Sequence, residues 1–218
     1  MNRRWRKRTI GTALTAWFLL SGGCFFSPRE SEDPNQIGPP VDEPAKTPEE
    51  VTTKLVEAFG SWNDTKFLAL LSEDYVYRPD RSDSTDLADA GVFPFADPWD
   101  RNDEELVFNR ILACFNDGTV KSGTMVLSYT GEQVLTDSSV TGFSTFETDY
   151  HLGIYYVFLV AGAELDSVAF DGALKLFIRD EGDGTYAAYR WEDFRKGSRD
   201  TWGFYKGQVE SNQEYCPE

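Results

Sequence analysis

The sequence predicts a folded domain of the α+β class over residues 47–218. Before residue 116 three segments have apolar residues at helical spacing. From residue 124 onward they instead alternate with polar residues, which is typical of strands that have one buried face. Helices followed by long antiparallel strands indicate a domain in which the helices pack on one face of a single sheet.

The first helix is expected to begin at Thr47. The segment T-P-E-E supplies a capping threonine, a proline at the first helical position and a glutamate that completes a capping box. Four apolar residues then recur at helical spacing. They are Val51, Leu55, Phe59 and Trp62. A second, short helix is expected to be capped by Asp64, and a short strand is expected at residues 75–78.

Residues 79–99 predict a long irregular insertion. Its first four aspartates, Asp80, Asp83, Asp86 and Asp89, lie three residues apart, a spacing that does not fit the EF-hand loop of calcium-binding proteins. A third helix is expected at residues 100–115, and the N-D-G sequence that follows is a helix stop signal. Cys114 would lie on the apolar side of this helix, where a free cysteine is a common core residue.

The second half of the chain predicts four strands. We expect them at residues 124–129, 154–160, 170–179 and 185–194. The second strand is apolar on both faces, so it should be central in the sheet, whereas the third has one polar face. The last two strands would be joined by a hairpin turn with the sequence E-G-D-G.

Residues 1–23 predict a secretory signal peptide. Five cations between Arg3 and Arg8 precede an uncharged apolar run, and small residues then lead to Cys24. The apolar run is too short to span a bilayer, which needs about 20 residues. A buried N-terminal helix is the alternative, but buried helices do not usually begin with five cations.

The segment L-L-S-G-G-C resembles the lipobox of bacterial lipoproteins. The resemblance implies that the chain is cut before Cys24 and that lipid on this cysteine holds the protein to the cell membrane, because two or three acyl chains anchor stably. It also implies the outer membrane, with the domain facing the periplasm, since inner-membrane members carry aspartate where this chain has Phe25. Residues 24–46 are rich in proline and acids, which predicts an extended tether.

The strongly acidic charge of the chain excludes some classes of binding partner. The formal net charge is −16, and removal of the signal peptide with its five cations and no acids takes it to −21. This argues against nucleic-acid binding, which needs clustered lysine and arginine, and against electrostatic docking on anionic lipid. The acids either keep the protein soluble or attract a cationic or metal-bearing partner.

Cysteine and histidine usage argues against a metal site. The chain has one histidine and no C-x-x-C pair, and no acid cluster has ligand spacing, so we expect no bound metal and no cofactor. With Cys24 assigned to lipid, Cys114 and Cys216 remain. They could form a disulfide in an oxidising compartment or stay free, and the sequence leaves both open.

Two segments resemble the nuclear transport factor 2-like superfamily, which includes ketosteroid isomerases and SnoaL-type polyketide cyclases. The first is E-A-F-G-S-W-N-D-T-K-F-L-A-L-L-S-E-D-Y-V-Y, and the second is Y-R-W-E-D-F before T-W-G. The resemblance covers residues 48–205 and implies a cone in which three N-terminal helices pack on a curved antiparallel β-sheet around a pocket. The insertion at 79–99 and the weakly patterned stretch at 131–148 depart from the family. The alternative fold is a β-sandwich or small barrel with extra helices.

No residue of the chain matches the catalytic motif of this superfamily, and no nucleophile elbow, phosphate loop or dinucleotide fingerprint is present. Five aromatic strand residues could line an apolar pocket, although a plain core would explain them as well. They are Tyr156, Phe158, Phe177, Tyr189 and Trp191. His151 could act as a base on the same face as Asp149, but a lone histidine is more often a half-exposed strand residue. Arg190, Glu192 and Asp193 could line the mouth of a pocket, but we expect them to face outward or to be paired at the end of the last strand.

The leading hypothesis is therefore a membrane-anchored lipoprotein whose domain binds a small apolar ligand or an envelope protein, through the cone pocket or the sheet face. We do not expect an enzyme. An isomerase or cyclase that uses the cone pocket is the first alternative, and a deep pocket holding a carboxyl with a raised pKa beside a tyrosine hydroxyl would favour it. A structural protein of the envelope is the second alternative.

Overall fold

The computed structural model describes residues 43–89, 99–116, 120–137, 142–158 and 165–211 of the 218-residue chain. Within these ranges five helices and seven strands occur. The helices are α1 (Pro48–Gly60), α2 (Asp64–Ala69), α3 (Arg81–Asp89), α4 (Arg101–Asn116) and α5 (Trp202–Ser211). The strands are β1 (Leu71–Arg78), β2 (Trp99–Asp100), β3 (Val120–Tyr129), β4 (Val134–Thr136), β5 (Phe143–Phe158), β6 (Leu165–Asp180) and β7 (Tyr186–Arg195).

The expected start of the first helix is confirmed. Thr47 caps α1, and its hydroxyl accepts a hydrogen bond from the Glu50 backbone N–H (3.3 Å). The Glu50 side chain reaches back and accepts from the Lys46 N–H (2.8 Å), one residue before the cap. The cap of α2 differs from the expectation, because the Asn63 side chain, and not Asp64, accepts from the first turn of the helix.

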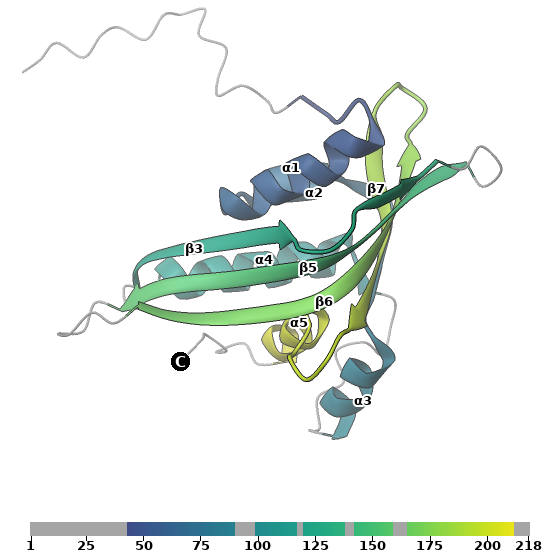
Figure 1. Cartoon of the computed structure of the whole chain (residues 1–218). Coiled ribbons are helices and arrows are strands. Elements are labelled where there is room, and N and C mark those ends of the chain that lie inside the picture. The colour runs from purple at the N-terminus through teal and green to yellow at the C-terminus, as the bar shows by residue number, and fades with distance from the viewer. Residues whose placement is uncertain (1–42, 90–98, 117–119, 138–141, 159–164, 212–218) are drawn as a thin grey trace, which may run out of the picture. The chain divides into compact units, whose positions relative to one another are not determined.

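All seven strands belong to one sheet with the order β2-β1-β7-β6-β5-β3, and β4 pairs with β5 beyond the end of β3. Strands β5 and β6 are the longest, and Figure 1 shows them bending along their length. Their pairing runs without a break from Phe143 opposite Arg179 to Val157 opposite Leu165. The turn that joins β6 to β7 lies where expected, with Gly182 and Gly184 at positive φ.

The two faces of the sheet differ in polarity, because side chains alternate along each strand. The inner face is defined by the buried side chains of β5 and β6. These are Phe146, Tyr150, Leu152, Ile154, Leu174, Leu176 and Ile178. The positions between them define the outer face, on which Glu147, Asp149, His151, Lys175 and Arg179 are partly exposed. In the described part of the chain the inner face is therefore apolar and the outer face carries charged side chains.

Helices α1, α4 and α5 fill the inner face. The Phe59 ring of α1 lies 6.0 Å from the rings of Phe108 in α4 and Trp202 in α5, both edge-to-face. Trp202 in turn lies 6.0 Å from Phe170 of β6. The expected α+β class is confirmed, and helices cover the inner face of the curved sheet.

The expected arrangement of three N-terminal helices is not confirmed, because in the described part of the chain four helices precede β3 and a fifth follows β7. The insertion at 79–99, expected to be irregular, contains α3, and a further helix, α5, follows the last strand. Strand β1 lies beside β7 in parallel, so the sheet is not wholly antiparallel. The weakly patterned stretch 131–148 contributes β4 and the first residues of β5. In the described residues no helix is long and apolar enough to cross a membrane.

Candidate functional site

A carboxylate lies buried at the centre of the inner face. Asp193 of β7 accepts hydrogen bonds from the Tyr77 hydroxyl (2.8 Å), the Tyr150 hydroxyl (2.8 and 3.0 Å to its two oxygens) and the Gly203 backbone N–H (2.9 Å). The Tyr150 oxygen also accepts from the Trp202 N–H (2.9 Å). These hydrogen bonds connect β1, β5 and the first turn of α5 to β7. We call the five residues the Asp193 cluster: Asp193, Tyr77, Tyr150, Trp202 and Gly203.

A buried ion pair adjoins the Asp193 cluster. Lys206 of α5 donates to Glu104 of α4 at 2.7 Å, and their side chains are 1% and 2% exposed. The Tyr75 hydroxyl donates to the same Glu104 oxygen at 3.2 Å. The Lys206 ammonium lies 3.1 Å from the centre of the Tyr77 ring and 5.3 Å from that of Trp99, so aromatic faces shield the charge where water is absent.

Burial shifts the pKa of each ionisable group in this region toward the neutral form. Burial raises the pKa of Asp193 to about 6, although the hydrogen bonds from Tyr77 and Tyr150 oppose the shift. It also raises the pKa of Glu104 and lowers that of Lys206, each against the attraction of the partner charge. The pKa of Asp193 therefore lies close to the physiological range.

Two glycines make room for this arrangement. A Cβ at Gly172, the cross-strand partner of Tyr150, would lie 2.8 Å from the Tyr150 ring. A Cβ at Gly203 would meet the Tyr77 hydroxyl even more closely. Both glycines allow a tyrosine hydroxyl to reach Asp193, and a larger residue at either position would displace it.

A carboxyl with a raised pKa beside two tyrosine hydroxyls is the set of groups that isomerase chemistry uses. Here, however, these groups are engaged with one another. Asp193 and the two tyrosines that it binds are each 1% exposed, and Trp202 is 2% exposed. Both hydroxyls donate to Asp193. This part of the cone is filled by its own side chains, and a substrate could contact Asp193 only after α5 had moved.

The four aromatic pocket candidates whose side chains the structure describes lie on two different faces of the sheet. Tyr156 and Trp191 are buried on the inner face, at 3% and 2% exposure. Phe177 lies on the outer face beneath the Arg190 guanidinium, 3.7 Å from its ring centre, and Tyr189 is half-buried there. The side chain of Phe158 lies outside the described residues.

The remaining candidates fall partly outside the described residues. Cys24 and Cys216 lie in segments that the structure does not describe, as does the side chain of Cys114, so lipidation and the disulfide remain predictions. Among the described residues no group of three or more histidine, cysteine, aspartate or glutamate side chains could hold a metal ion.

His151 has an orienting partner that the sequence did not indicate. Its Nδ1 lies 2.7 Å from Asp171, the residue directly opposite on β6, and Arg199 holds the other Asp171 oxygen at 2.5 Å. Asp149, the expected neighbour, is instead paired with Lys196. Burial raises the pKa of Asp171, but the hydrogen bonds from His151 and Arg199 outweigh it, and the pKa lies below its usual value.

No nucleophile is aimed at this histidine among the described residues. Ser128 lies opposite His151 on β3, but its hydroxyl donates to the His151 backbone oxygen (3.3 Å) and not to the imidazole. The row Ser128–His151–Asp171 thus lacks the serine-to-imidazole hydrogen bond of a catalytic triad. Its polar contacts instead fix the segment after β7 to the outer face, through Arg199.

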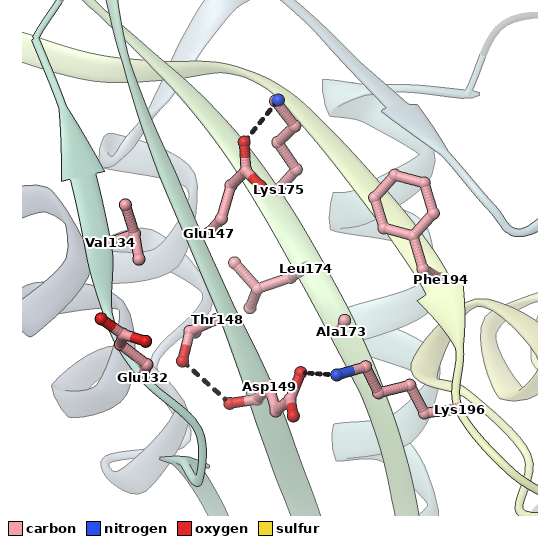
Figure 2. A pocket seen from close by; sticks show the side chains of 10 residues that line it. All are labelled: Glu132, Val134, Glu147, Thr148, Asp149, Ala173, Leu174, Lys175, Phe194 and Lys196. Atoms are coloured by element: carbon pink, nitrogen blue, oxygen red, sulfur yellow. Dashed lines mark hydrogen bonds and ion pairs between the residues drawn. The ribbon is translucent and has the colours of Figure 1, made fainter.

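The outer face carries a groove of about 330 Å³, which we call the outer groove. Figure 2 shows its floor across β5 and β6, with Val134 on one side and Phe194 on the other. Two ion pairs cross it, Lys175 with Glu147 (2.5 Å) and Lys196 with Asp149. Its lining consists of Glu132, Val134, Glu147, Thr148, Asp149, Ala173, Leu174, Lys175, Phe194 and Lys196.

The side chains at the edges of the outer groove are accessible to solvent, whereas those of the Asp193 cluster are buried. Val134 is 45% exposed and Phe194 is 43% exposed, and they are two of the four large apolar side chains that are exposed in the described part of the chain. The groove wall on the β4 side depends on Gly131, because a Cβ there would lie 3.0 Å from the Asp149 side chain. Of the residues that line this groove, the sequence pointed only to Asp149, as a neighbour of His151.

No protein-family profile matches the sequence, and no curated protein matches it. Solved structures do resemble the fold. One is a nuclear transport factor 2-like superfamily protein from Salmonella enterica serovar Typhimurium, with 8% identity, coverage of 68% of this chain and 88% of that chain, and a TM-score of 0.44. The beta subunit of benzoate 1,2-dioxygenase from Burkholderia mallei has 12% identity, coverage of 66% and 85%, and a TM-score of 0.49. A ketosteroid isomerase-like protein from Erwinia carotovora atroseptica has 12% identity, coverage of 68% and 94%, and a TM-score of 0.42.

Proposed function

We propose that this chain is a lipid-anchored binding protein of the bacterial cell envelope, which engages a partner through the outer groove. The observation that carries the proposal is a contrast between the two faces of the sheet. On the inner face the polar groups bind one another and are buried. On the outer face charged and apolar side chains line an accessible groove. Exposed apolar groups beside such charges are typical of an interaction site.

The anchor is proposed from the lipobox resemblance. Cys24 would carry the lipid, and residues 24–46 would hold the domain away from the bilayer. Phe25 after the cysteine favours the outer membrane, with the domain facing the periplasm. A tethered domain with an accessible groove would meet its partner at the membrane surface.

Replacement of Cys24 by serine should release the protein from the membrane. Without a thiol no acyl chain can be attached, and the remaining chain is too acidic to adsorb to anionic lipid. Cell fractionation followed by immunoblotting would show the wild-type protein with the membranes, whereas C24S would not be lipidated and would remain soluble after cell lysis. Equal membrane retention of C24S would contradict the anchor.

Photo-crosslinking in cells tests the groove. A photoreactive amino acid placed at Val134 or Phe194 of the full-length lipoprotein should give a covalent adduct of discrete mass, because both positions border the groove. The same amino acid at Leu106 is the matched control, since Leu106 of α4 is 42% exposed and lies outside the groove. No adduct at Val134 and Phe194, or the same adduct at Leu106, would overturn the proposal.

An enzyme is the second candidate function, because the Asp193 cluster contains the carboxyl and tyrosine hydroxyls that favour it. Catalysis there would require α5 to leave the cone, since Gly203 and Trp202 of α5 occupy hydrogen bonds of the cluster. The binding proposal expects the Val134 adduct to persist in Asp193→Asn, because this variant changes the inner face alone. A folded D193N protein that no longer forms the adduct would favour the enzyme.

A further inference from the structure

The charges of the outer groove are unbalanced. Three carboxylates line it, those of Glu132, Glu147 and Asp149, against the two ammonium groups of Lys175 and Lys196, which leaves a net charge of −1 (−3 + 2). Each lysine is already paired with one carboxylate. Within the described residues Glu132 makes no ion pair, so it presents an uncompensated negative charge at the edge of the groove.

The charge of the whole protein acts in the same direction. At −16 for the chain and −21 after loss of the signal peptide, its long-range field attracts cations and repels acidic molecules. A nucleic acid, an anionic lipid surface and a second copy of this chain are all disfavoured as occupants. A positively charged group meets a favourable field at long range and a free carboxylate at contact.

The apolar side chains at the edges of the groove favour an occupant that has an aliphatic or aromatic group next to its cation. Val134 and Phe194 stand on opposite sides of the floor in Figure 2, and Ala173 lies between them without a bulky side chain. A free polyamine would neutralise the acids but would leave the Phe194 ring in water. An occupant that carries both kinds of group covers Phe194 as well.

The width of the groove suits an extended chain. It reaches from β4 across β5 and β6 to β7, which are four neighbouring strands about 4.8 Å apart, or about 14 Å in all. Four residues of extended polypeptide cover about the same length.

We propose that the outer groove binds an extended polypeptide segment that carries a lysine or arginine beside aliphatic side chains. The cation would be held by Glu132 together with Asp149, and the aliphatic groups would pack on Phe194 and Val134. This inference rests on the proposed function, because it names the partner of the same groove. It goes further in specifying a basic, apolar peptide.

The test uses three short peptides with blocked ends and the mature lipoprotein in detergent. One peptide alternates valine with lysine, the second alternates valine with glutamate, and the third alternates serine with lysine. Fluorescence anisotropy should show binding of the valine–lysine peptide, at least tenfold weaker binding of the serine–lysine peptide, and none of the valine–glutamate peptide. Binding should weaken with added salt, because screening shortens the reach of the charges.

Variants assign the binding to the groove. Glu132→Lys and Phe194→Ser should each weaken binding of the valine–lysine peptide at least tenfold. Glu105→Lys and Leu106→Ser, neighbouring exposed residues of α4, are matched controls and should leave it unchanged. All four changes are at exposed or partly exposed side chains, and circular dichroism of each variant would check that it is folded.

Two results would overturn the inference and leave the proposed function standing. One is the absence of valine–lysine binding while the Val134 adduct still forms in cells. The other is an adduct whose mass equals two copies of this chain, which would make the groove a contact between copies. Equal binding of the two lysine peptides, unaffected by E132K, would also overturn it, since unspecific attraction to an acidic protein would then suffice.

Discussion

Replacement of Glu104 by leucine should destabilise the domain by about 3–5 kcal/mol, the largest single effect that we expect. The variant leaves the Lys206 ammonium 1% exposed without its carboxylate partner. The Lys206 pKa is already lowered by burial, so the lysine would have to lose its proton or draw water into the core. Urea denaturation followed by tryptophan fluorescence would measure the loss.

The double variant Glu104→Leu/Lys206→Met tests whether the destabilisation of E104L comes from the unpaired buried charge of Lys206. Removing both charges leaves apolar groups of similar volume among Tyr77, Trp99 and Trp202, which already surround the ammonium. We expect the double variant to be at least as stable as E104L alone, and close to wild type. A double variant whose loss equals or exceeds the sum of the two single losses would contradict this account.

The exposed ion pair between Glu147 and Lys175 on the outer face is the control for the Glu104–Lys206 variants. Glu147 and Lys175 are 51% and 31% exposed and lie 2.5 Å apart, similar to the buried pair in distance. Glu147→Leu should nevertheless cost less than about 1 kcal/mol, because water solvates either partner when the other is removed. The comparison would show that burial, and not the ion-pair distance, determines the effect.

The elements with a regular apolar pattern could be predicted from the sequence. The T-P-E-E start of α1, the helix after residue 100 and the alternation in β6 and β7 all depend on local spacing, and the structure has them with small shifts of their bounds. Helix α5 lacks such a pattern. Gly203 and Gly207 lower its helix propensity, and Lys206 stands at a fully buried position where an apolar residue would be expected.

The polar contacts of the candidate sites depend on pairings between distant segments. The pairing of β1 with β7 brings Tyr77 to Asp193 across 116 positions, and the register of β5 with β6 sets Asp171 opposite His151. One local signal was available. Alternation along β7 places Asp193 on the same face as the buried Trp191, so its burial could have been inferred. Charged residues are seldom buried, however, and Asp193 was expected to face outward or to be paired at the strand end.

Asp193 should make the stability of the domain fall as pH rises from about 4 to about 6. Burial raises its pKa from the usual 3.8 to about 6, so between these values the folded state holds a proton that the unfolded state has lost. The folded state keeps this proton fully bound below about pH 5, and the change in stability is complete by about pH 7. A shift of this size corresponds to about 3 kcal/mol.

The variant Asp193→Asn isolates this contribution, because asparagine keeps the shape of the side chain and does not titrate. The free energy of unfolding of wild type minus that of D193N should fall by about 3 kcal/mol between pH 4 and pH 7. Other titrating groups are present in both proteins and largely cancel in the difference. A difference that is independent of pH would show that Asp193 is not neutral in the folded protein at pH 4 to 6.

Asp74 provides a control of opposite sign. Its side chain is 59% exposed, and the hydrogen bond from Arg179 lowers its pKa despite a small opposing effect of desolvation. Any stability that it contributes is present above its unfolded pKa and is lost as pH falls, so the difference between wild type and Asp74→Asn should rise with pH where that for D193N falls. Opposite slopes would identify burial, and not the acidity of the chain as a whole, as the cause at Asp193.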